Sequence, residues 1–351
     1  MTIETKYSNI PSIDAEMGKK VFNYIQTLTK PVGSLGRLEE LAVQLGEITS
    51  NPFPTVTPPG ILVFAADHGV AVEGVSAYPK EVTAQMVLNF LGGGAGINVF
   101  GRQIGAIQRV IDIGVASDII EEPGVIQKKV RYGTGNFLVE EAMTRNEVEQ
   151  ALEIGFSQCE EVIQEGAKCI ILGELGIGNT TTSSAMLAAL NGVDSVGDLI
   201  GRGTGISDEK LLLKQQVIEK ALAERKPNPS DPIDVLSKVG GLEIAGMAGA
   251  MLAAAQNRVP ILVDGFISTI SALVAKAINP AAGDYMIVGH RSAEPGHLLA
   301  LQLLEKQPLI DLGMRLGEGT GAAIAFPILQ SATLMIKEMA TFESAGVSSK
   351  E

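Results

Sequence analysis

The segment "GILVFAADHGV" (residues 60–70) has the pattern that decides the fold, an uninterrupted apolar run that ends in a short polar turn. Stretches with helical spacing separate it from similar segments, and the clearest of these stretches opens with a capping box at Thr144 and Glu147. Continuous apolar strands that alternate with helices are typical of a parallel sheet covered on both faces. The similar segments are "RVIDIGVAS" (109–117), "CIILGELGIGNTT" (169–181), "VPILVDGFIST" (259–269) and "YMIVGHRSAEPGH" (285–297).

The two ends of the chain have a different character. Residues 14–30 and 36–50 carry apolar residues at three- and four-residue spacing, and residues 322–340 form a second apolar helical stretch. The proline-rich segment 51–60 reads as a rigid linker. We therefore expect a Rossmann-like α/β domain over residues 60–320. A small helical subdomain is expected from residues 1–55 together with residues 322–351.

Composition excludes several classes of partner. The net charge of −13 argues against a nucleic acid or an anionic membrane, since both require a basic face. The longest uncharged apolar run, residues 244–255, is too short to span a bilayer.

Cys159 and Cys169 fit no zinc-site spacing, and the N-terminus does not resemble a signal peptide. We expect a cytoplasmic protein with reduced, buried thiols.

Polar side chains follow the apolar runs of the predicted sheet. In an open parallel sheet, ligands bind beyond the carboxyl ends of the strands. One polar turn would mean little, but several at the same edge indicate a site. The side chains concerned are Asp67, His68, Glu174, Asn179, Thr180, Thr181, Thr182, Asp264, His290, Arg291, Ser292, Glu294 and His297.

Two glycine-rich turns suggest where an anion would bind. In "GIGNTTTSSAMLAAL" (176–190) the glycines allow close backbone approach, and the helix that follows presents the positive end of its dipole. "GRGTG" (201–205) is a second such turn, in which we expect Arg202 to favour an anion. Neither matches a P-loop or GxGxxG, which argues against an ordinary ATPase or dinucleotide dehydrogenase. A plain loop or helix cap is the alternative for each turn.

The three histidines, His68, His290 and His297, have no HxH or HExxH spacing. Structural or hydrogen-bonding roles are therefore favoured over metal ligation, and no metal site is predicted. No GxSxG elbow is present, so acyl-enzyme chemistry has no support.

Glu318 lies between two glycines in "MRLGEGTGAAIAF" (314–326). A glutamate in a loop is more often solvated than catalytic. Here, however, the glycines would let a flat ligand come close, and the apolar sequence that follows would limit water and raise the proton affinity of the carboxylate. Together with Glu174 and Asp264, this residue indicates an anion-binding α/β enzyme with a carboxylate base.

Five segments together resemble nicotinate-nucleotide–dimethylbenzimidazole phosphoribosyltransferase, a family of the lower-ligand branch of cobalamin biosynthesis. The likeness runs in order from about residue 30 to residue 325. It implies transfer of the phosphoribosyl group of nicotinate mononucleotide to 5,6-dimethylbenzimidazole, giving α-ribazole 5′-phosphate and nicotinate with inversion at the anomeric carbon. It also implies a homodimer that needs no metal or other cofactor. The segments are "KPVGSLGRLEELA" (30–42), "FAADHGV" (64–70), "GELGIGNTT" (173–181), "GRGTG" (201–205) and "GEGTGAA" (317–323).

By this resemblance, Glu318 is the general base, and Glu174 and Asp264 are supporting residues: Glu174 orients ribose hydroxyls or water, and Asp264 supports that side of the site. The stretch "SAYPKEVTAQMV" (76–87) matches the benzimidazole-binding segment of the family, which points to Tyr78 and Gln85. A related transferase or nucleosidase for another base, and a non-catalytic binding protein, are the alternatives. The residues implied to hold the phosphate and ribose are Gly176, Gly178, Asn179, Thr180, Gly203 and Gly205.

Overall fold

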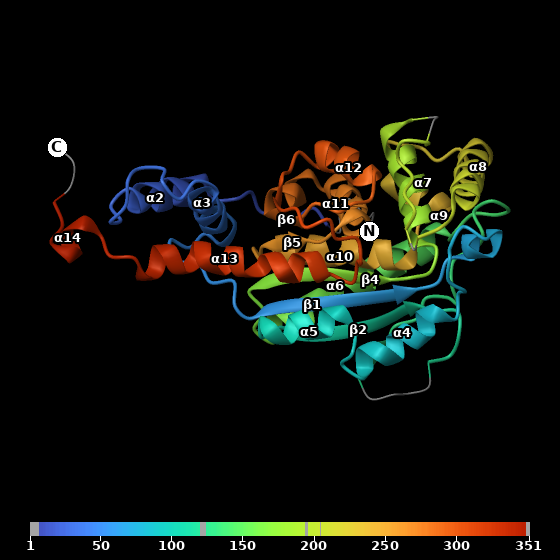
Figure 1. Ribbon diagram of the computed structural model, residues 1–351, viewed down its shortest axis with the longest axis horizontal. Coiled ribbons are helices and arrows are strands. Elements are labelled where there is room, and N and C mark those ends of the chain that lie inside the picture. The colour runs from blue at the N-terminus through green and yellow to red at the C-terminus, as the bar shows by residue number, and fades with distance from the viewer. Residues whose placement is uncertain (1–6, 120–123, 194–195, 204, 349–351) are drawn as a thin grey trace.

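The computed structural model describes residues 7–119, 124–193, 196–203 and 205–348. Its centre is a seven-stranded parallel sheet with the order β3-β2-β1-β4-β5-β6-β7 (Figure 1). This order contains the 3-2-1-4-5-6 arrangement of doubly wound sheets, in which ligands bind where the strand order reverses. The strands are β1 (Pro59–Ala66), β2 (Ile107–Gly114), β3 (Val125–Gln127), β4 (Cys169–Leu175), β5 (Ile261–Val263), β6 (Met286–His290) and β7 (Pro308–Ile310).

The predicted parallel α/β fold is confirmed, and each of the five apolar segments contains a strand. The edge strands β3 and β7 were not predicted from the sequence. Each has only three residues and none of them is fully buried, so no apolar run stands out, whereas the equally short β5 (Ile261–Val263) is fully buried. The capping box also forms, because Thr144 and Glu147 exchange hydrogen bonds at the start of α6 (Arg145–Gln164).

Helices cover both faces of the sheet, as the continuous apolar strands predicted. Along β1, Leu62 and Phe64 face one buried cluster, whereas Ile61 and Val63 face the other. The first cluster includes residues of α6, α7 (Asn179–Asn191), α9 (Pro232–Val239), α10 (Leu242–Gln256), α11 (Phe266–Ile278) and α12 (Gly296–Leu304). The second includes residues of α2 (Ala15–Ile25), α3 (Arg37–Thr49), α4 (Val82–Leu91), α5 (Gly96–Gln103) and α13 (Thr320–Glu338). The other helical segments are η1 (Gly69–Glu73), α8 (Asp208–Arg225), η2 (Pro280–Tyr285) and α14 (Phe342–Ala345).

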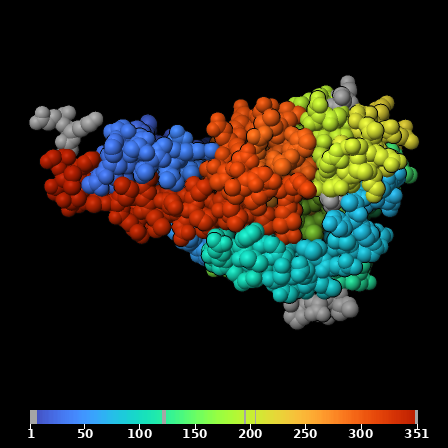
Figure 2. All heavy atoms as spheres, in the orientation of Figure 1, coloured from blue at the N-terminus to red at the C-terminus, as the bar shows by residue number. Residues whose placement is uncertain are grey.

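Helices α2 and α14 lie near each other at the narrow end of the molecule (Figures 1 and 2), whereas Tyr7, ahead of α2 in the chain, is buried in the α/β core beside Phe156. An antiparallel bridge joins Leu28 to Thr341. Helix α13 begins beside the sheet, where Phe326 is buried with Ile171, and its later turns are buried with residues of α2 and α3. Because one helix takes part in both regions, the division into a subdomain and an α/β domain stays a prediction.

Two expectations from the composition concern the cysteines and membrane-spanning helices. Cys159 and Cys169 are both buried and free, and burial raises the pKa of each thiol. Within the described residues, no helix is both long and apolar enough to cross a bilayer.

Candidate active site

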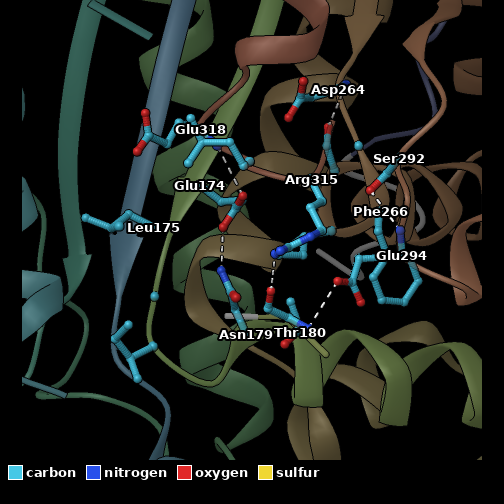
Figure 3. Close-up of a pocket in the computed structure, with 18 of the residues that line it drawn as sticks. Glu174, Leu175, Asn179, Thr180, Asp264, Phe266, Ser292, Glu294, Arg315 and Glu318 are labelled. Carbon is cyan, nitrogen blue, oxygen red and sulfur yellow. Dashed lines mark hydrogen bonds between the residues drawn. The ribbon is translucent and has the colours of Figure 1, made fainter. Parts of the chain in front are cut away.

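A cavity of about 570 Å³ opens at the carboxyl edge of the sheet, where β4, β5 and β6 end (Figure 3). The strand order reverses between β1 and β4, so the cavity lies where doubly wound sheets bind ligands. Most of the residues proposed from the sequence line it: Tyr78, Glu174, Gly176, Gly178, Asn179, Thr180, Gly203, Asp264 and Glu318.

Three expected residues do not line the cavity. Gln85 is exposed on α4, and Gly205 follows Thr204, which lies outside the described residues. Arg202 is turned away, since its guanidinium pairs with Asp208 and donates to the carbonyl of Ile206. The expectation that Arg202 faces a bound anion is therefore corrected.

Arg315 supplies the guanidinium that lines the cavity. Its Nη1 donates to the carbonyl oxygen of Gly203 at 2.7 Å. The residue stands only three positions before Glu318 in the sequence, but an arginine in an exposed loop carries no signal of its own.

The turn before α7 has the geometry of an anion site. Gly178 is the N-cap of α7 with φ 100°, and a Cβ on Gly176 would lie 2.2 Å from the carbonyl oxygen of Ala66. Only glycine fits such a close approach. The N-terminus of α7 meets the cavity at Asn179 and Thr180, where the positive end of the helix dipole favours a negative group.

Lys214 and Glu294 hold the neighbouring turn in place. Lys214 Nζ donates to the hydroxyl of Thr180 and to the carbonyl of Gly201, both at 3.1 Å. Glu294 Oε1 accepts the backbone N–H of Gly203 at 3.1 Å. Burial lowers the pKa of Lys214 to about 8, and the nearby Glu294 opposes this effect. Sequence reasoning missed Lys214 because a lysine within a charged helix reads as a solvated surface residue.

The turn that carries Glu318 has three consecutive residues in the left-handed region. The φ values of Gly317, Glu318 and Gly319 are 86°, 63° and 88°. A Cβ on Gly317 would lie 2.3 Å from Glu174 Oε1, and a Cβ on Gly173 would lie 2.1 Å from the carbonyl oxygen of Glu318. The glycines are thus needed for packing within the protein, a role that the sequence did not indicate. A non-glycine residue held in this conformation costs roughly 1–3 kcal/mol and is typical of functional sites.

The Glu318 side chain is only 5% exposed although it lines the cavity. Burial raises the pKa of its carboxyl, and the charge of Asp264 raises it further. The backbone N–H of Ile97, which donates to Oε2 at 3.3 Å, acts in the opposite direction. The result is a carboxylate that accepts a proton more readily than a solvated glutamate does.

Glu174 and Asp264 both contact the backbone around Glu318. Glu174 lies between Glu318 and Asn179, and its Oε1 accepts the N–H of Glu318 at 3.3 Å (Figure 3). Asp264 Oδ1 accepts the N–H of Ala322 at 2.8 Å, in the first turn of α13. Both carboxylates therefore position the segment that bears Glu318.

Two histidines have the hydrogen-bonding role expected from the sequence. His68 lies between Glu243 and the hydroxyl of Thr182, with both contacts at 2.8 Å. His297 Nδ1 accepts the N–H of Ser292 at 2.8 Å, and burial lowers its pKa to about 4. His290 lines the cavity, with Nε2 3.5 Å from Asp264 Oδ1. In the described part of the chain, no three His, Cys, Asp or Glu residues are grouped as metal ligands.

Comparison with known proteins places the chain among phosphoribosyltransferases. A family model described as "Phosphoribosyltransferase" matches residues 10–347. Similar proteins include the nicotinate-nucleotide–dimethylbenzimidazole phosphoribosyltransferase of Chloroflexus aggregans, 53% identical over 324 residues and 92% of each chain. The protein of the same name from Geobacter sulfurreducens is 51% identical over 348 residues and 99% of each chain. A crystal structure of the Thermus thermophilus protein of that name covers 96% of this chain and 100% of its own, at 42% identity and a TM-score of 0.91.

Proposed function

The chain belongs to the nicotinate-nucleotide–dimethylbenzimidazole phosphoribosyltransferase family, and we propose that it transfers the phosphoribosyl group of nicotinate mononucleotide to 5,6-dimethylbenzimidazole. The products are α-ribazole 5′-phosphate and nicotinate, and the pathway is cobalamin biosynthesis. One observation carries the proposal: a buried carboxylate with raised proton affinity, Glu318, lines the same cavity as the N-terminus of α7, which no side chain of the described residues caps.

The phosphate of the nucleotide binds at the N-terminus of α7 under this proposal. Gly176, Gly178 and Gly203 let its oxygens reach backbone N–H groups, while Asn179 and Thr180 contact the phosphate or ribose. Support comes from the close approach at Gly176 and from the helix dipole. Gly205 and Gln85 remain proposed contacts from the family resemblance alone.

The reaction is a displacement at the anomeric carbon. A ring nitrogen of the benzimidazole forms the new C–N bond, and the bond to the pyridinium nitrogen breaks. The electron pair of that bond returns to the pyridine ring, so nicotinate leaves without needing a proton. Attack from the face opposite the leaving group inverts the anomeric carbon and gives the α-riboside.

Glu318 accepts the proton that the benzimidazole must lose. The second ring N–H becomes acidic as the first nitrogen forms its bond, and a positioned base contributes typically ~10²–10⁴-fold to the rate. Tyr78, which lines the cavity and is half exposed, stands beside the flat ring. Glu174 and Asp264 keep Glu318 in place through the backbone contacts described above.

Assembly and location are further parts of the proposal. The homodimer and the absence of any cofactor rest on the family resemblance. A cytoplasmic location accords with two buried, free cysteines, which are typical of reducing compartments.

Measuring nicotinate release with and without 5,6-dimethylbenzimidazole tests the function. We expect release to depend on the added base, and the riboside product to be the α-anomer by nuclear magnetic resonance. Comparable release in water alone would instead identify a nucleosidase. Tight binding of both ligands without any release would identify a non-catalytic binding protein.

A further inference from the structure

Glu174 lies between Glu318, in the turn at residues 317–319, and Asn179, which follows the turn at residues 176–178 (Figure 3). Glu174 is 7% exposed. Oε1 accepts the backbone N–H of Glu318 at 3.3 Å, and Oε2 contacts the side-chain amide of Asn179. Gly317 packs so close to Oε1 that no Cβ would fit there. Both carboxyl oxygens are therefore held by neutral groups of the protein.

The charges that face Glu174 are negative. Asp264 lies at the end of β5, Glu243 lies at the start of α10, and Glu318 lies in the turn before α13. Within the described residues, no lysine, arginine or histidine pairs with Glu174: His68 pairs with Glu243, and Arg315 donates to Gly203. Burial is the largest influence on the pKa of Glu174, and the neighbouring carboxylates add to it. The N–H of Glu318 acts in the opposite direction, and the pKa of Glu174 is raised to about 8.

We propose that Glu174 is a neutral carboxylic acid at neutral pH, and that in this form it positions Glu318 instead of serving as a second base. A neutral Glu174 adds no charge beside Glu318 and does not repel the phosphate of an incoming nucleotide. Its role in turnover rests on the proposed function, whereas its protonation state does not.

Asn179 gives the proton of Glu174 a partner. A half-turn of the Asn179 amide exchanges its oxygen and nitrogen, so that Oδ1 accepts the Glu174 hydroxyl. Nδ2 then takes the place of Oδ1 in a residue that lines the cavity. The site gains an N–H donor for an oxygen of the phosphate or ribose, in a cavity that already holds Asp264 and Glu294 as acceptors. Meanwhile Glu174 Oε1 still accepts the N–H of Glu318.

Infrared difference spectroscopy on the ligand-free protein tests the protonation state without any substrate. We expect the wild-type protein at pH 7 to show the carbonyl stretch of a protonated carboxyl, which disappears as the pH rises through about 8. The band should be missing in Glu174→Gln and present in Glu294→Gln, which removes another cavity carboxylate that accepts a backbone N–H. A band that survives in Glu174→Gln, or no band in the wild type, would overturn the proposal.

Turnover tests the positioning role. Glutamine imitates the neutral acid, because it accepts the Glu318 N–H and donates to Asn179. We expect kcat to fall by less than about 10-fold in Glu174→Gln. In Glu174→Ala it should fall by more than about 100-fold, because Glu318 loses its support and a displaced catalytic group has effects of that size. The fall in kcat/KM of the wild type above pH 8 should be absent in Glu174→Gln.

Equal inactivation of Glu174→Gln and Glu174→Ala, with both proteins folded, would contradict the positioning role. A wild-type protein without benzimidazole-dependent release would instead refute the proposed function. The infrared result stands apart from both outcomes, since it needs neither substrate.

Discussion

The turns at residues 176–178 and 317–319 both lead into a helix at the cavity but differ in backbone and in chemistry, since all three residues of the second turn are left-handed and only Gly178 is in the first. Each ends in a left-handed glycine that is the N-cap of a helix: Gly178 (φ 100°, ψ −9°) precedes α7, and Gly319 (φ 88°, ψ 8°) precedes α13. Both turns reach the cavity. The residue between the glycines is apolar in the first turn, Ile177, and acidic in the second, Glu318.

The occupancy of the helix N-termini also differs. Asp264 already accepts an N–H from the first turn of α13, at Ala322, which neutralises the positive end of that helix. In the described part of the chain, no side chain caps α7, although the N–H groups of Asn179 and Thr181 already donate to the carbonyls of Gly176 and Gly178. The middle N–H of each turn is held by the protein, through Thr83 for Ile177 and Glu174 for Glu318. Two turns that share only a left-handed glycine N-cap thus bring different groups to the cavity, an uncapped helix N-terminus in one case and a carboxylate in the other.

Removing the carboxylate from the second turn should have the largest effect. Glu318→Gln keeps the size of the side chain and an acceptor for Ile97, but it cannot take a proton. We expect kcat to fall by ~10²–10⁴-fold, with KM for nicotinate mononucleotide within about threefold of wild type. Steady-state release of nicotinate measures both constants. Glu305→Gln, at an exposed surface position, is the matched control and should retain wild-type turnover.

Displacing the second turn without changing its charge is the next test. In Gly173→Ala, the new methyl group meets the backbone oxygen of Glu318, so the turn must shift. We expect a loss of about 100-fold in kcat, since displacements near 1 Å have effects of that size. In Gly283→Ala the nearest atom, in Lys276, lies at 3.4 Å, and turnover should be unchanged. Wild-type turnover in a folded Gly173→Ala protein would mean that the turn tolerates movement.

A carboxylate introduced into the first turn should weaken phosphate binding there. Ile177→Glu places a negative charge beside the N-terminus of α7. We expect KM for nicotinate mononucleotide to rise by roughly 10–100-fold through repulsion of the phosphate. Ile177→Gln has the same size and polarity without the charge, so it separates repulsion from poor packing. If both variants raise KM equally, the phosphate does not bind at this turn.

Removing the charge of Asp264 should have the smallest effect of these changes. It should appear in the dependence of kcat/KM on pH. The burial of Glu318 and the charge of Asp264 both raise the pKa of Glu318. Because the base acts in its ionised form, kcat/KM falls as the pH drops through this pKa. Asp264→Asn keeps an acceptor for Ala322 but removes the charge, so the acid limb should move to lower pH, by roughly half a unit. An unmoved acid limb would show that Asp264 acts only through the backbone.

Sequence patterns were sufficient for the centre of the fold. The runs that became β1, β2, β4, β5 and β6 were long or apolar enough to recognise, whereas the three-residue edge strands were not. The capping box at Thr144 also predicted the start of α6 correctly, because it depends on residues only three apart.

Site residues were predictable where they follow a strand in the chain. Glu174, Asn179 and Asp264 stand directly after apolar runs and reach the cavity. Lys214 and Arg315 come from a helix and a loop, and only the fold brings them to the Gly201–Gly203 region. The direction of Arg202 was decided by Asp208, six residues later, and glycine-rich spacing says nothing about that contact.

The most direct test of the two-turn account is to measure kcat and KM for nicotinate mononucleotide in Glu318→Gln and Ile177→Glu, side by side at saturating 5,6-dimethylbenzimidazole. We expect Glu318→Gln to lose kcat at nearly constant KM, whereas Ile177→Glu should raise KM far more than it lowers kcat. Near wild-type kcat in Glu318→Gln, or the same change in both constants for both variants, would contradict it.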